Sequence, residues 1–127
     1  MIKATALPPP AVRLPRCVRR SYRLELMAPG QRCLLWLSGR RQPGVHALGL
    51  LATSPEPVGD VTCTVEVVLH RLPEPVPRAE LVLDPDFAAA EVVRMPAGSN
   101  PSWLAAGALR AVLDRLDDAA LRAAGWR

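Results

Sequence analysis

The residues from Val61 to His70 alternate between apolar and polar side chains, and this pattern limits the possible fold more than any other feature of the sequence. The apolar positions are Val61, Cys63, Val65, Val67 and Leu69, and the polar ones between them are Thr62, Thr64, Glu66 and His70. Only Val68 breaks the alternation. A period of two predicts a β-strand with one buried face. We therefore expect Cys63, Val65 and Val67 to be buried.

Two shorter segments predict neighbours for this strand. Cys33–Leu37 is an apolar run between turn residues, which is typical of a strand buried on both faces, and Val45–Ala52 predicts the next strand after a Gly-containing loop. We expect these two strands to form a hairpin beside the long strand.

Other segments are less regular. Residues 7–16 contain four prolines and predict an extended segment that is neither a helix nor a central strand. The apolar residues of Val18–Met27 fit a helix or a strand. Short strands are expected at Glu80–Leu83 and Glu91–Met95.

A helical period begins after Gly98. Asn100 is the expected N-cap, with Pro101 at the first helical position. One apolar face is formed by Leu109, Val112, Leu113, Leu116 and Ala120. Asp117 or Asp118 is expected to cap a second short helix, and Gly125 to end it.

Strands followed by helices indicate an α+β fold rather than a parallel α/β fold. We expect a small, curled, mostly antiparallel β-barrel with one or two helices packed on it, and a single domain over residues 1–127.

The sequence argues against several classes of protein. Pro, Arg or Gly interrupts every apolar run before the roughly 18 residues of a membrane helix, and no secretory signal is recognisable at the N-terminus. We expect a soluble, cytoplasmic protein without a membrane partner. Cys17, Cys33 and Cys63 are an odd number at wide spacing, which predicts reduced thiols rather than disulfides or a zinc ribbon.

No pattern for catalysis is recognisable. His46 and His70 lie in different predicted strands without nearby ligand partners, and nothing around Ser38 resembles a nucleophile elbow. The sequence also lacks GxGxxG and the P-loop lysine. We expect no enzyme activity, no metal and no cofactor.

Charge is divided unequally along the chain. Residues 1–45 carry nine basic side chains and one acidic one, a net +8, whereas residues 46–127 carry seven basic and eleven acidic ones, a net −4. A basic region favours binding to polyanions. An Arg-rich solvated surface without a partner explains the same composition.

Aromatic residues are few, and three of the five are Trp. Trp36 lies in an apolar strand that ends at the polar Ser38, and Trp103 follows the turn at Ser99 and Asn100. A Trp at such a position is a core residue or the wall of a pocket that holds a flipped base.

Two stretches resemble the EVE domain family of the PUA-like superfamily. The first runs from Arg16 to Gly49 and the second is VVRMPAGSNPSWL, residues 92–104. The matching positions are Val18, Arg19, Arg20, Gly30, Trp36, Leu37, Ser38 and Gly49. Arg20, Gln31 and Leu37 depart from the asparagine, aspartate and histidine of the family. Ile2-Lys3 stands where the family has an aromatic residue before a lysine, so the first strand is expected to be shortened.

The resemblance implies a pocket that accepts a modified base, such as a modified cytosine, extruded from DNA more readily than from RNA. The expected base-binding residues are Arg19, Arg20, Tyr22, Trp36, Ser38, Ser99 and Asn100. The expected phosphate contacts are Arg13, Arg16, Arg23, Arg40 and Arg41. The alternative is a non-catalytic protein-interaction or structural module whose own side chains fill the pocket.

Overall fold

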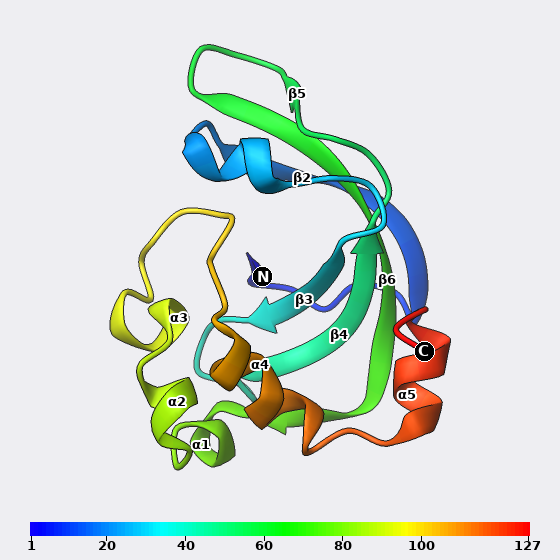
Figure 1. Cartoon of the computed structure of the whole chain (residues 1–127), viewed down its shortest axis with the longest axis vertical. Coiled ribbons are helices and arrows are strands. Elements are labelled where there is room, and N and C mark those ends of the chain that lie inside the picture. Colours follow the sequence, from blue (N-terminus) through cyan, green and yellow to red (C-terminus); the bar gives the residue numbers. More distant parts are fainter.

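A six-stranded sheet carries the fold in the computed structural model, which describes all residues from 1 to 127. Its strands are β1 (Ile2–Ala4), β2 (Ala11–Arg19), β3 (Arg32–Leu37), β4 (Gly44–Leu51), β5 (Glu56–Pro57) and β6 (Thr62–Pro77). They follow the order β1-β3-β4-β6-β2, and β5 pairs with β6. Every pair is antiparallel except β1 with β3. The sheet is strongly curled, so the protein has an α+β fold built on a half-barrel (Figure 1).

Helices follow the last strand, apart from one 3₁₀ helix, η1 (Tyr22–Leu26), between β2 and β3. They are α1 (Arg78–Leu81), α2 (Pro85–Ala88), α3 (Glu91–Arg94), α4 (Ala106–Leu113) and α5 (Asp118–Ala123). Five short helices thus replace the one or two that the sequence predicts. None of them has the length and apolar character needed to span a bilayer.

The strand predicted from Val61 to His70 is confirmed as part of β6. It begins at Thr62 and continues to Pro77, and its predicted inner residues Cys63, Val65 and Val67 are buried. The predicted hairpin is also confirmed as β3 and β4, of which only β4 pairs with β6.

Two apolar clusters pack on opposite faces of the sheet. One contains 11 buried residues inside the curl, and the other contains 16 between the sheet and the helices. β3 contributes to both, because Cys33 and Leu35 point into the curl whereas Leu34 and Trp36 face the helices. This explains why the segment reads as a continuous apolar run.

The Pro-rich segment is extended, as predicted, and its second half forms β2 at one end of the strand order. Pro15 lies opposite Glu66 of β6. Because β2 has only one neighbouring strand, a residue without an N–H is tolerated there. The ambiguous segment after it divides into the end of β2 and η1.

The segment around Asn100 bridges the two ends of the curled sheet. The Arg19 N–H of β2 donates to the Asn100 carbonyl at 2.8 Å. The Asn100 side chain bonds to the backbone of Lys3 in β1, and Ser102 and Met1 exchange two further hydrogen bonds. This segment therefore links β1 and β2 through hydrogen bonds, as an additional strand between them would.

Three predictions about the helical region are wrong. The segments expected as strands at Glu80–Leu83 and Glu91–Met95 lie in and after α1 and α3, where they cover the sheet instead of extending it. The late helix begins at Ala106, not at Pro101, because the Asn100 side chain bonds to Lys3 rather than capping a helix. Leu116 consequently lies beyond α4, although it still packs on the core.

The end of the chain follows its prediction. The Asp117 side chain accepts a hydrogen bond from the Ala120 N–H at 2.8 Å and caps α5. Gly125 has a φ of 73° directly after that helix, and the Trp126 N–H donates to the Leu121 carbonyl. This arrangement is a Schellman motif, and it turns Trp126 back onto the sheet.

Candidate functional site

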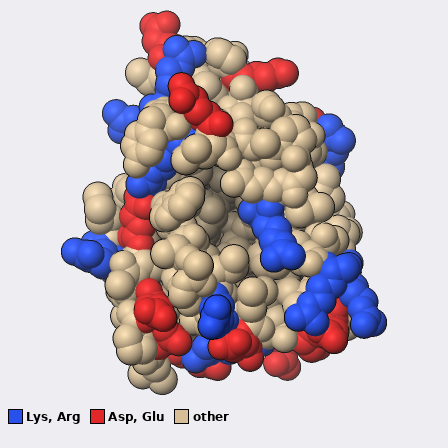
Figure 2. All heavy atoms as spheres, viewed as in Figure 1, with Lys and Arg blue, Asp and Glu red and all other residues tan.

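A cavity of about 190 Å³ opens between the sheet, η1 and the segment before α4. Its walls are mostly apolar and come from β1, β3, the turn after η1, residues 101–104, α4 and Trp126. In the space-filling view a hollow lies where the N-terminus and β3 are seen in the ribbon view (Figures 1 and 2). At roughly 30 Å³ per water molecule, this volume suits one ring system rather than a dinucleotide cofactor.

Polar groups are few in the cavity and all of its charged side chains are basic. Arg23, Gln31, Arg32 and Ser102 line it together with the apolar residues, and no acidic side chain does. The Arg32 guanidinium lies over the Trp126 ring, 5.3 Å from its centroid, and donates to the Trp126 carbonyl at 2.9 Å. These groups can donate hydrogen bonds to the acceptor atoms of a bound ring.

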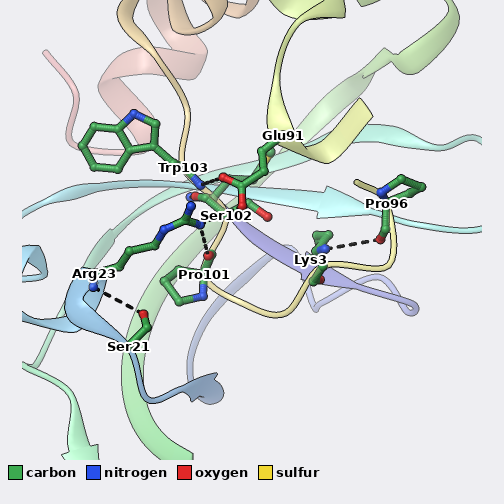
Figure 3. A network of polar contacts seen from close by, with 10 residues as sticks. Lys3, Ser21, Arg23, Glu91, Pro96, Pro101, Ser102 and Trp103 are labelled. Carbon is green, nitrogen blue, oxygen red and sulfur yellow. Dashed lines mark hydrogen bonds and ion pairs between the residues drawn. The ribbon is translucent and has the colours of Figure 1, made fainter. Parts of the chain in front are cut away.

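Arg23 is held by an ion pair at the mouth of the cavity. Its Nη1 lies 2.8 Å from Oε1 of Glu91 and 3.3 Å from the Pro101 carbonyl oxygen (Figure 3). The hydrogen bond from Arg23 lowers the pKa of Glu91 and raises that of Arg23. Both groups therefore stay charged at neutral pH, and the pair joins η1 to α3.

Trp103 presents its indole to solvent at the same mouth. Its backbone N–H donates to Oε2 of Glu91 at 3.2 Å, whereas the indole points away from that carboxylate (Figure 3). The residue is 54 % exposed and also lines the cavity. The backbone at Trp103 is held by its bond to Glu91 and by the two bonds of the preceding Ser102 to Met1. An exposed indole on such a fixed backbone can stack on an aromatic ligand.

Cys33 lies deeper in the same cavity. Burial raises the pKa of its thiol, so the group is protonated at neutral pH and is a weak nucleophile. The structure contains no group of three or more His, Cys, Asp or Glu side chains that could hold a metal ion.

The prediction that Trp36 forms a pocket wall is wrong. Trp36 is only 3 % exposed and stacks on Phe87 of α2, with 5.7 Å between the ring centroids. Neither Trp36 nor Ser38 lines the cavity, and the Ser38 N–H bonds to the Ala4 carbonyl. Trp36 is therefore a core residue, the other role considered for it, because Phe87 occupies the space over its ring.

The other predicted base-binding residues lie near the cavity without lining it. The Arg19 N–H donates to the Asn100 carbonyl, so these two residues are adjacent, but neither lies at Trp36 or Ser38 in a pocket. Tyr22 is 73 % exposed, and Arg20 and Ser99 are exposed as well. The side-chain amide of Asn100 is fully engaged in hydrogen bonds with the backbone of Lys3.

The predicted phosphate contacts do not form one surface. Arg13 pairs with Glu66 at 2.6 Å, and the inward-facing Arg16 has a buried Nε without a hydrogen-bond partner. The alternation of β2 explains this, since residues 13 and 16 point to opposite faces. Arg40 and Arg41 lie beyond the end of β3 that is remote from the cavity-lining residues 32–34.

Sequence reasoning overlooked Arg32 and Trp126. A hydrophobic residue directly after a helix-ending glycine commonly packs back on the helix in a Schellman motif, and this signal could have identified Trp126 as buried. Its Nε1 donates to the Gly49 carbonyl at 2.8 Å. No comparable signal exists for Arg32, whose position depends on Trp126.

Comparisons with protein-family models, with curated proteins and with solved structures find no match for this chain.

Proposed function

We propose that this domain binds nucleic acid and holds one modified base, extruded from the strand, in the cavity beside Trp103. The observation that carries the proposal is the combination of a single-ring cavity with an exposed indole at its mouth. Base–aromatic stacking contributes about 1–3 kcal/mol per base.

The electrostatics of the cavity support this proposal. Arg23 and Arg32 are its only charged side chains, and Gln31 and Ser102 add neutral hydrogen-bonding groups. Arg19 and Arg20 lie beside the segment around Asn100 that leads to Trp103; they are exposed and make no ion pair, so their guanidinium groups are available to phosphates.

The fold supports it as well, at a coarser level. A curled antiparallel sheet with a lateral cavity is compatible with the PUA-like architecture that the EVE resemblance implies. Two resembling residues have structural roles here, however, since Trp36 packs in the core and Gly49 lies against β6. The proposal therefore relies on Trp103 in place of Trp36.

Binding to a panel of oligonucleotides tests the proposal. Single-stranded and duplex DNA and RNA would carry methylated cytosine, hydroxymethylated cytosine, methylated adenine or no modification. We expect one modified oligonucleotide to bind best, and its affinity to fall steeply between about 50 and 200 mM salt. Trp103→Ala should weaken that binding about five- to hundredfold, whereas Trp103→Phe retains most of it.

Leu83→Ala is the matched control, because Leu83 is also an exposed large apolar residue, at 79 %, but does not line the cavity. Equal binding of all oligonucleotides, or wild-type affinity in Trp103→Ala, would exclude base reading in this cavity. In that case the exposed Tyr22, Leu26 and Trp103 around it would favour the alternative of a protein-interaction surface.

A further inference from the structure

Trp103 separates the cavity from a second hollow. This hollow has a volume of about 390 Å³ and lies beside α3, between the end of α2 and the start of α4. It is lined by Ala89, Ala90, Glu91, Arg94, Met95, Trp103 and Ala105. Trp103 is the one residue that lines both depressions.

The second hollow combines small apolar walls with one available cation. Three alanines leave room for a bulky group, and Met95 adds a polarizable side chain that is 61 % exposed. Arg94 is exposed and forms neither an ion pair nor a side-chain hydrogen bond.

The acidic residue at this hollow does not oppose an anionic ligand strongly. Both oxygens of the Glu91 carboxylate are occupied, one by the Arg23 guanidinium at 2.8 Å and the other by the Trp103 N–H at 3.2 Å. The nearby Lys3 ammonium donates to the carbonyl group of Pro96 (Figure 3) and also to that of Gly98. Arg94 is thus the available charged group.

We infer that the second hollow binds the nucleotide next to the extruded base, with Arg94 on the phosphate that links the two. This inference depends on the proposed function, because it assumes that a base occupies the first cavity. The argument for it is that Trp103 lines both depressions, so they adjoin at this residue. If one base of a strand occupies the first cavity, the neighbouring nucleotide of that strand lies close to the second hollow. The ligand is then at least two nucleotides long, and a free nucleoside uses only half of the site.

Neutralising single phosphates tests the inference directly. The probe is single-stranded DNA with one central methylated or hydroxymethylated cytosine, whichever binds more tightly. Two further versions replace the phosphate on its 5′ or its 3′ side by an uncharged methylphosphonate. We expect one replacement to weaken binding to the wild-type protein about three- to tenfold, and Arg94→Ala to cause a similar loss on the normal probe.

The combination of the two changes is decisive. If Arg94 contacts that phosphate, Arg94→Ala and the sensitive methylphosphonate together cause no greater loss than either alone. Arg122→Ala is the charge-matched control, since Arg122 is exposed on α5, makes no ion pair and lines neither depression, and it should bind every probe like the wild type.

A second variant tests the hollow without changing charge. Ala89→Leu narrows it, and we expect the oligonucleotide to bind more weakly while the free modified nucleoside binds unchanged. Independent, additive losses, or wild-type affinity in both Arg94→Ala and Ala89→Leu, overturn the inference while leaving base binding intact. Absence of binding by every modified probe removes the proposed function and this inference together.

Discussion

The side-chain amide of Asn100 pairs with both backbone groups of Lys3. Its Oδ1 accepts a hydrogen bond from the Lys3 N–H at 2.8 Å, and its Nδ2 donates to the Lys3 carbonyl at 3.1 Å. The amide thus replaces one residue of a neighbouring strand along β1. Because the Asn100 carbonyl also accepts from Arg19, a single residue connects both ends of the sheet and positions Ser102 and Trp103 at the cavity.

Replacing Asn100 by Ala should therefore destabilise the protein by about 1–3 kcal/mol, because two partly buried backbone groups lose their partners. Asn100→Asp keeps the acceptor but places a carboxylate oxygen against the Lys3 carbonyl oxygen, so it should cost at least as much. Urea unfolding measures both changes. Ser99→Ala is the control, since that exposed side chain makes no hydrogen bond within the chain, and a loss as large as for Asn100→Ala would contradict the assignment.

Gly49 tolerates no side chain in β4. A Cβ at this position would lie 1.9 Å from the Val68 carbonyl oxygen of β6. Gly49→Ala should lower the free energy of unfolding by more than about 3 kcal/mol, because β4 and β6 must separate. Gly59→Ala is the matched control: its nearest neighbour would be 3.6 Å away, in ordinary contact. Similar urea midpoints for the two variants would show that β4 and β6 can move apart at low energetic cost, despite the 1.9 Å contact between the added Cβ and the Val68 oxygen.

Trp36 and Trp103 should separate stability from binding. Trp36→Ala removes a buried ring stacked on Phe87 and should cost about 3–5 kcal/mol of stability, while the folded fraction binds oligonucleotide normally. Trp103→Ala should weaken oligonucleotide binding and change stability little, because Trp103 is half-exposed. Urea unfolding and binding are measured on the same samples. If Trp36 contacted the ligand directly, Trp36→Ala would bind more weakly even under conditions in which all of the variant is folded.

The Arg23–Glu91 pair should make stability depend on pH in the acid range. The pKa of Glu91 is lowered in the folded protein, so its contribution is complete above the unfolded value of about 4.3 and is lost as the pH falls through the folded pKa. Each side chain of the pair is about a quarter exposed, at 26 %, and for a solvent-accessible pair of this kind we expect about 0.2–1 kcal/mol.

Glu91→Gln tests this prediction, since it should reduce stability at neutral pH but not at low pH. Unfolding free energies of both proteins across this range give the difference. Glu74→Gln, at an exposed glutamate without an ion pair, is the control for removing one carboxylate. A constant difference between Glu91→Gln and the wild type at all pH values would mean that the lost interaction is not the charge pair.

Local patterns in the sequence determined much of the framework. The alternation in β6, the apolar run of β3 and the Asp117 and Gly125 signals around α5 each depend on neighbours along the chain. Backbone geometry imposes a period of two on a strand and favours glycine at a positive φ, so these features are readable without a structure.

The site was decided only by the tertiary structure. Trp36 and Trp103 are each followed by a leucine and lie within two residues of a serine, yet Phe87 covers the first, whereas the second is left half-exposed at the cavity mouth. Asn100 reads as a helix cap, but its partner Lys3 lies 97 residues away. Burial and the choice between competing hydrogen bonds depend on which distant elements pack together, and no local pattern encodes these contacts.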